Sequence, residues 1–447
     1  MSWFRSFTLV ALASSALTLS VSPPVSAQET QRFSTELALD VGSPQVADVT
    51  EDGSHAVVVV RTRRGRVDVD HERYGDPTYV APALVTAMVV DTRSGERIWL
   101  HEQPAQVSDF TWSPDGSRLV YIHYEGSRFE VRLYETGGSE TRPLTLRTDK
   151  SVASATSLVW SPDGGTLLLS LRPTGWAERA REAFHALTDA AVIVQDSRND
   201  FLAWDRVRNI ADEQITALVS VADGSVREIL TDVVPRDVDF TADGSSITYA
   251  TAVRTKTSYT REDGTDYGLH ALNLSSGETT ELVEPSEDRV QVIWNDRRDA
   301  YAYTEDGAVL VRRLADDEPR DVTDGLRTLP GDTTEIDFSV DRWSPDGGRL
   351  LVTSSKAWHL LDVAGGSLRT LLELEEDEEL RPRRSVERWS EDGRHLYFTY
   401  SARDRWERGL KRLEVEGGAV SNVMIDTGVY GQWNVSADGS TAVHTWG

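Results

Sequence analysis

WSPDGSRLVY, the stretch from Trp112 to Tyr121, recurs along the chain and decides the fold. Close copies begin at Trp160 (WSPDGGTLLLS), Trp343 (WSPDGGRLLVTS) and Trp389 (WSEDGRHLYFTY); weaker copies begin at Val49 (VTEDGSHAVVVV), Phe240 (FTADGSSITYA) and Val435 (VSADGSTAVHTW), and Trp294 begins a copy (WNDRRDAYAYT) whose turn has degenerated. The eight turns lie at positions 53, 116, 164, 244, 297, 347, 393 and 439. Length alone would suggest two or three domains, but self-similarity at this spacing indicates one repeat fold.

Each residue type in the repeated phrase has a physical role in a β-hairpin. Ser or Thr opens the turn, Pro fixes φ at the second position, and Gly adopts the left-handed conformation. The apolar residues after Gly are typical of a buried strand, and the aromatic residue before the turn is expected to fill the space between stacked sheets. We therefore interpret the Asp–Gly pairs as structural turn residues rather than general acids: Asp52, Gly53, Asp115, Gly116, Asp163, Gly164, Asp243, Gly244, Asp346, Gly347, Asp392, Gly393, Asp438 and Gly439.

A second hairpin follows each of the first seven phrases. These hairpins begin at Ala87, Val131, Ala217, His270, Val309, Trp358 and Leu410. Two hairpins make a four-stranded unit, which is the size of a propeller blade; a purely β solenoid is the alternative. The sequence thus predicts an all-β protein, a β-propeller of four-stranded antiparallel blades.

The eighth repeat is predicted to be incomplete, which leaves seven complete blades. After Val435 the sequence supplies one strand, Ser440 to Trp446, so the last blade is expected to be truncated from about residue 433. An open strand edge is a feature that folded proteins usually avoid. We expect the segment Phe33 to Val41 to help close the ring by pairing into this blade.

Residues 1–27 are typical of a secretory signal peptide. Arg5 is followed by an apolar stretch from Phe7 to Leu19, and Val25-Ser26-Ala27 offers small residues for cleavage. A single-pass anchor is the alternative, but the apolar run is short for a bilayer. The mature chain, residues 28–447, is then expected to form the propeller in the periplasm or outside the cell, with no membrane insertion after cleavage.

The composition excludes several kinds of partner and site. The chain has no cysteine, so disulfides, thiolate metal sites and a lipoprotein anchor are excluded. The formal net charge of −26 repels nucleic acid and anionic lipid, so we expect no nucleic-acid partner. The nine histidines are scattered without metal-ligand spacing, and we predict no cofactor and no metal. Asp68, Asp70 and Glu72 imitate part of a calcium loop but lack its Gly and distal Glu, which favours a charged surface loop.

The third repeat carries the most distinctive insertion, at about residues 172–213. Apolar residues at helical spacing, beginning at Trp176, predict a helix there. Trp176, Glu178 and Glu182 are candidates for contact with a substrate or another domain. The alternative is that this helix only caps a blade.

The W-S-P-D-G repeats resemble those of TolB and of the propeller of the prolyl oligopeptidase family, which includes dipeptidyl peptidase IV and acylaminoacyl-peptidases. The count of eight phrases and the first phrase soon after the signal favour the peptidases over TolB. The resemblance implies a propeller that gates and orients peptides for an α/β-hydrolase domain, and that domain is expected to be missing from this chain.

The catalytic residues of that family have no counterpart in the sequence. The nucleophile of such hydrolases lies in a G-x-S-x-G turn, and the chain contains none. We therefore predict no catalytic triad in this chain, although its parent would be a serine peptidase. The expected function is that of a non-catalytic propeller whose partner is a peptide or its own missing hydrolase domain. The alternative is a stand-alone, TolB-like periplasmic module that binds a protein partner.

Overall fold

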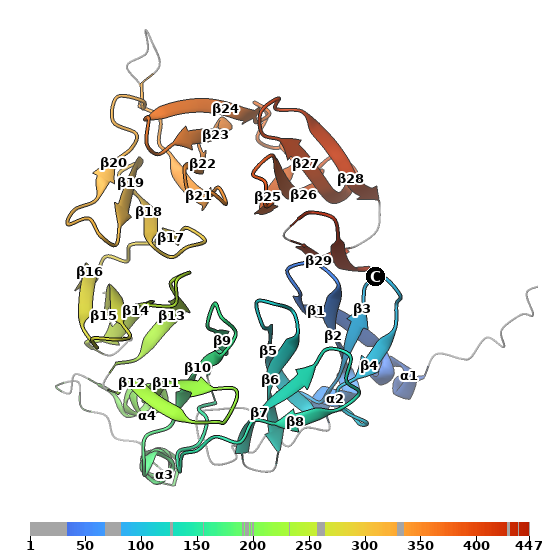
Figure 1. Cartoon of the computed structure of the whole chain (residues 1–447), viewed down its shortest axis with the longest axis vertical. Coiled ribbons are helices and arrows are strands. Elements are labelled where there is room, and N and C mark those ends of the chain that lie inside the picture. The colour runs from blue at the N-terminus through green and yellow to red at the C-terminus, as the bar shows by residue number, and fades with distance from the viewer. Residues whose placement is uncertain are drawn as a thin grey trace, which may run out of the picture.

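The structure, a computed structural model of the 447-residue chain, describes residues 34–67, 82–125, 128–154, 156–189, 201–231, 233–256, 264–328, 335–426, 430–436 and 438–446, with the single residues 192, 196 and 198. Sheets follow one another around a ring, with one strand of each sheet nearest the centre (Figure 1). The prediction of a β-propeller is confirmed. The signal peptide and the calcium-like residues Asp68, Asp70 and Glu72 lie outside the described residues.

The described residues form seven four-stranded antiparallel sheets, or blades, and one two-stranded sheet. Blades 1 to 4 consist of β1 (Gly42–Val49), β2 (His55–Thr62), β3 (Val85–Asp91) and β4 (Arg97–Trp99); β5 (Gln106–Trp112), β6 (Arg118–Glu125), β7 (Arg128–Glu135) and β8 (Thr141–Pro143); β9 (Val159–Trp160), β10 (Thr166–Leu171), β11 (Ile215–Ser220) and β12 (Val226–Leu230); and β13 (Pro235–Phe240), β14 (Ser246–Arg254), β15 (Thr265–Asn273) and β16 (Thr279–Ser286).

Blades 5 to 7 consist of β17 (Ile293–Trp294), β18 (Ala300–Glu305), β19 (Ala308–Arg313) and β20 (Arg320–Asp321); β21 (Ser339–Trp343), β22 (Arg349–Thr353), β23 (Ala357–Asp362) and β24 (Ser367–Glu373); and β25 (Arg383–Trp389), β26 (His395–Ser401), β27 (Arg408–Glu414) and β28 (Val420–Asp426). The eighth sheet pairs β29 (Tyr430–Val435) with β30 (Ala442–Trp446). Seven complete blades and an incomplete eighth match the prediction.

The hydrophobic core lies between neighbouring blades rather than at one centre. Blades 2 and 3, for example, share a cluster that joins Val120 and Ile122 of β6 to Trp160 of β9 and Leu169 of β10. The aromatic residue before the turn is buried in most blades, as expected for a ring that fills the space between sheets. Each blade is therefore stabilised mainly by its two neighbours.

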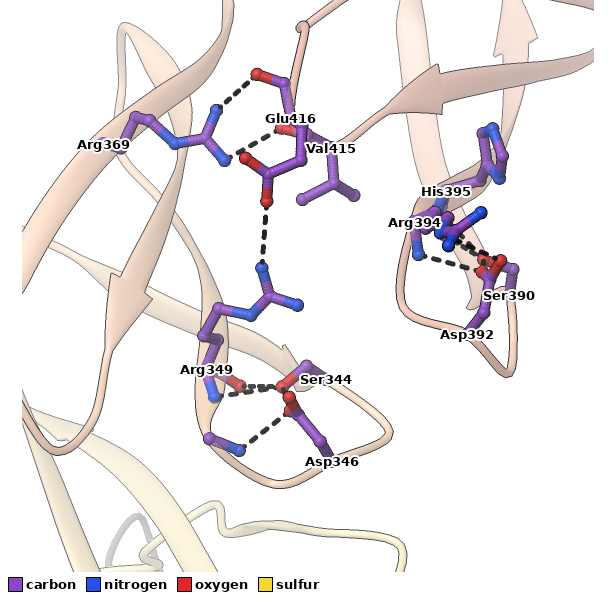
Figure 2. A network of polar contacts seen from close by, with 11 residues as sticks. Ser344, Asp346, Arg349, Arg369, Ser390, Asp392, Arg394, His395, Val415 and Glu416 are labelled. Atoms are coloured by element: carbon purple, nitrogen blue, oxygen red, sulfur yellow. Dashed lines mark hydrogen bonds and ion pairs between the residues drawn. The ribbon is translucent and has the colours of Figure 1, made fainter.

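Seven of the eight repeated turns use the same side-chain hydrogen bonds, and in the blade 5 turn the amide side chain of Asn295 replaces the hydroxyl. In blade 6, Ser344 Oγ donates to Asp346 Oδ1 (2.5 Å) and accepts from the amide of Arg349 (3.0 Å), while the amide of Gly348 donates to Asp346 Oδ1 (3.0 Å) (Figure 2). Gly347 has φ +69°, a left-handed conformation that favours glycine. The hydroxyl, the carboxylate and the glycine therefore each stabilise this turn.

The ring of turns closes between the eighth sheet and blade 1. Gly53, in the first turn, lies so close to the eighth that an added Cβ would be 2.7 Å from Cβ of Thr441 and 2.8 Å from Cβ of Ser436. Strand β1 also packs against both β29 and β30. The two-stranded sheet thus fills the gap between blades 7 and 1 at the turn face (Figure 1).

The prediction that residues 33–41 pair as a strand into the last blade is wrong for the described part of this segment. Thr35–Asp40 forms helix α1, whose N-terminus is capped by Ser34, which accepts a hydrogen bond from the amide of Leu37 (3.2 Å). Arg64, in the short helix α2 (Arg63–Val67), donates to Asp40 (2.6 Å). A side-chain cap and this ion pair favour a helix over a strand here.

The insertion of blade 3 is helical, as predicted, and is fixed to two blades. It consists of α3 (Trp176–Thr188) and α4 (Ala203–Asp212), between β10 and β11. Trp176 Nε1 donates to the carbonyl of Ile210 (2.6 Å), and Arg254 of blade 4 donates to Asp212 Oδ2 (2.6 Å). No helix in the described ranges is long and apolar enough to cross a membrane.

Candidate binding site at the central opening

The candidate site is the central opening of the ring on the face that carries the repeated turns. A cavity of about 770 Å³ is lined by the inner strands and turns of blades 1 to 5 and 7. A second cavity of about 320 Å³ adjoins it beside blades 6 and 7. The two share Glu51, Trp294, Asp296 and Arg388, so they form one continuous opening.

The second position of the repeated turn faces this opening in blades 1 to 7. Pro114, Pro162 and Pro345 line the opening in blades 2, 3 and 6. In blades 1, 5 and 7 the residues at the same turn position are Glu51, Asp296 and Glu391. Because the turns share one backbone geometry, replacing the apolar ring by an acid places a carboxylate on the rim.

These three rim carboxylates have no ion pair or hydrogen bond with any described residue. Burial by the surrounding blades raises the pKa of Asp296, while Arg388 and Arg342 across the opening lower it. Glu51 and Glu391 show neither a hydrogen bond nor a salt bridge within the described part of the chain, and both are exposed. The rim therefore offers anionic groups that are free to meet a ligand.

The arginines of the opening hold neighbouring blades together. Arg342 donates to the carbonyls of Val386 (2.6 Å) and Glu387 (2.5 Å), and Arg388 donates to the carbonyl of Val435 (2.6 Å). Arg342 lies beside a β-bulge in β21, and Arg388 lies beside a β-bulge in β25; each is the innermost strand of its blade. A bulge turns a side chain away from the regular alternation, which lets these guanidinium groups reach the next blade.

A third arginine neutralises the acids of blade 4. Arg298 lies 3.5 Å from Asp237 and 3.2 Å from Asp239. Burial raises the pKa of Asp239, and the Arg298 charge opposes that rise. The five carboxylates that line the two cavities outnumber the three guanidinium groups, so the opening is acidic overall.

The lining suits binding rather than nucleophilic chemistry. The described residues that line either cavity contribute carboxylates, guanidinium groups and the rings of Trp160, Trp294, Trp343 and Trp389. No Ser, Thr, Cys, Lys or His is among them. The indoles of Trp160, Trp343 and Trp389 are buried and form the floor of the opening, so the exposed carboxylates are the groups that favour cationic ligands, through ion pairing.

The residues proposed from the sequence lie elsewhere. Trp176 is buried, with 4% of its surface exposed, whereas Glu178 and Glu182 are exposed on α3. The insertion joins the ends of β10 and β11 that point away from the repeated turns, so these residues and the opening lie on opposite faces. The sequence prediction did not identify Glu51, Asp296 and Glu391 as site residues, although loss of the turn proline marks all three.

No family model matches the chain, and no curated protein matches it. Among solved structures, the dipeptidyl peptidase 4 of Porphyromonas gingivalis has 13% sequence identity over 87% of this chain and 53% of its own, with a TM-score of 0.51. A prolyl endopeptidase matches with 11% identity over 91% of this chain and 54% of its own (TM-score 0.48), and TolB of Agrobacterium tumefaciens with 11% over 74% and 82% (TM-score 0.33). The chain thus spans about half the length of the two peptidases, and at these identities the likeness concerns the fold.

Proposed function

We propose that this chain is the non-catalytic propeller of an exported prolyl oligopeptidase-type serine peptidase, which admits and orients peptides for a hydrolase domain. The observation that carries the proposal is the acidic, tryptophan-lined opening with three unpaired rim carboxylates. The fold shared with a dipeptidyl peptidase supports it, because that protein acts on peptides and has a chain about twice as long as the matched part.

The charge of the opening selects the kind of peptide. Glu51, Asp296 and Glu391 attract a peptide that carries Lys or Arg, and the walls of low dielectric focus this attraction. The same groups repel an acidic peptide. Binding through exposed charges weakens with salt, since the Debye length falls to about 8 Å at 0.15 M ionic strength.

The test measures fluorescence anisotropy of a labelled Lys/Arg-containing decapeptide with residues 28–447. The triple variant Glu51→Gln/Asp296→Asn/Glu391→Gln is expected to weaken binding about 3- to 150-fold, because each of the three charge contacts contributes roughly 0.2–1 kcal/mol.

The matched control removes three acids from the opposite face. Glu376, Glu378 and Glu379 are exposed between β24 and β25, and the variant that replaces all three with Gln has the same net charge as the triple variant. We expect it to bind like the unmodified chain. Equal loss in both variants would show that only net charge matters, and that result would refute the proposed site.

A stand-alone binding module is the second candidate, and one observation favours it. Trp406, in the loop between β26 and β27, is 75% exposed, and Leu380 in a loop at the same end of blade 7 is 55% exposed. Trp406 is the most exposed large apolar side chain among the described residues, and we infer that it contacts the partner. Cross-linking of the exported protein in its native host, with Trp406→Ala as comparison, would distinguish a separate protein partner from a hydrolase domain of the same polypeptide.

A further inference from the structure

Blade 2 carries a group of potential metal ligands on one face of its sheet. His123 and Glu125 are two residues apart on β6, so they lie on the same face of the sheet. Glu130 of β7 pairs directly with His123 in the strand register. One ligand atom from each of the three side chains lies within 4.8 Å of the others.

The imidazole of His123 has a nitrogen that the described chain leaves unsatisfied. Nδ1 is buried without a hydrogen-bond partner, and its distance to Glu125 Oε2 is 3.9 Å, too long for a hydrogen bond. A buried polar atom without a partner costs about 1–3 kcal/mol. In native structures a buried atom of this kind is explained by strain, by a functional role, or by an ordered water or ion that binds it.

The connection from β4 of blade 1 to β5 of blade 2 places another histidine beside this cluster. The ring of His101 lies 4.6 Å from that of His123, and His101 Nε2 is hydrogen-bonded to Tyr121 Oη (2.9 Å). These two histidines are 22 positions apart in the sequence, and the packing of blade 1 on blade 2 brings them together. A search for histidines at ligand spacing therefore missed them.

We propose that His123, Glu125 and Glu130 bind one divalent transition-metal ion of the Zn²⁺ class, with His101 beside them at the interface of blades 1 and 2. Zn²⁺ accepts imidazole nitrogen and carboxylate oxygen at about 2.0–2.2 Å, and two carboxylates balance its charge. Three protein ligands leave room for water or for a fourth group. The site lies at the end of β6 that points away from the repeated turns, so it is separate from the central opening.

The charges around the cluster set its expected behaviour. Burial and the charge of Arg132 lower the pKa of His123, while Glu125 and Glu130 raise it. Arg132 lies 3.8 Å from Glu130 and competes with the metal for that carboxylate.

Titration calorimetry of residues 28–447 with Zn²⁺ alone, after removal of any affinity tag, tests the proposal. One Zn²⁺ per chain is expected. The variant Glu125→Gln/Glu130→Gln keeps the side-chain shape and is expected to bind at least about 10- to 100-fold more weakly, the loss seen even when an outer-shell partner is removed. Unchanged stoichiometry and affinity in this variant, or no Zn²⁺ binding by the unmodified chain, would overturn the proposal.

The control variant is His185→Ala/Asp189→Asn, which removes an exposed histidine–carboxylate pair from α3 (Nδ1 to Oδ2, 3.1 Å). It is expected to bind Zn²⁺ as the unmodified chain does, and loss of binding in it would contradict the assignment. Cobalt provides a measurement that needs no variant, because Co²⁺ held by imidazole and carboxylate has visible absorption bands distinct from those of the hydrated ion. If the spectrum in the presence of the chain is that of hydrated Co²⁺ alone, the result contradicts the proposed site.

Discussion

Replacing Gly53 with alanine tests whether the ring closes as the structure shows. The residue has φ +67°, and the left-handed conformation costs an alanine about 1–2 kcal/mol. In addition, the new methyl group would lie 2.7 Å from Thr441 Cβ and 2.8 Å from Ser436 Cβ, so the eighth sheet must move away from blade 1. Overpacking of this kind typically costs about 1–3 kcal/mol more. Gly53→Ala is therefore expected to lower the free energy of unfolding by about 2–5 kcal/mol.

Gly244→Ala is the matched control. Its φ is also +67°, but the nearest atom to an added Cβ is Cδ of Pro162 at 3.7 Å, an ordinary contact. This variant carries the backbone cost alone, about 1–2 kcal/mol. Urea unfolding followed by tryptophan fluorescence measures both. Equal destabilisation by the two substitutions would refute the contact between the first and last turns, and the closed ring with it.

Two further predictions concern the repeated phrase. Hydrogen bonds from Ser113 and Ser117 lower the pKa of Asp115 to about 2, below its value in the unfolded chain, so its stabilisation is present above about pH 4 and is lost as the pH falls toward 2. Ser113→Ala should cost about 1–3 kcal/mol at pH 7 and flatten the stability curve below pH 4; an unchanged acid limb in urea titrations would contradict this origin. Trp343 Nε1 donates to the carbonyl of Ile293 (2.8 Å), whereas the buried Nε1 of Trp389 has no partner among the described residues. Trp343→Phe is therefore expected to destabilise by about 1 kcal/mol more than Trp389→Phe, and the same urea assay would disprove it if the order were reversed.

The fold was predictable because each repeat encodes its own hairpin locally. Ser344, Asp346 and Gly347 fix a turn whatever lies beyond it, and the alternation after the glycine identifies a strand. Repetition then implies stacking, since one blade cannot bury both of its faces alone.

The sites were less predictable, because they depend on contacts between repeats. His101 and His123 meet only when blade 1 packs on blade 2. Glu51 and Asp296 share the rim because the turns form a ring, although each looks like an ordinary variation in its own repeat. The helix at Thr35–Asp40 was missed for a related reason, since its cap and its partner Arg64 outweigh a weak strand pattern.

The second residue of the repeated turn can change during evolution without disturbing the turn itself. The side chains of the hairpin's first and third residues make the turn's hydrogen bonds, and its fourth residue supplies the left-handed glycine, as in Ser390, Asp392 and Gly393. The second residue points to the opening, and the blades differ there: Pro345, Glu391 and Ala242 occupy equivalent places. Mutation can therefore rewrite the lining one residue at a time, with little loss of stability and no insertion. The residues that maintain the fold are therefore different from the residues that face the ligand. Related chains can change the ligand they bind while they keep the same repeats.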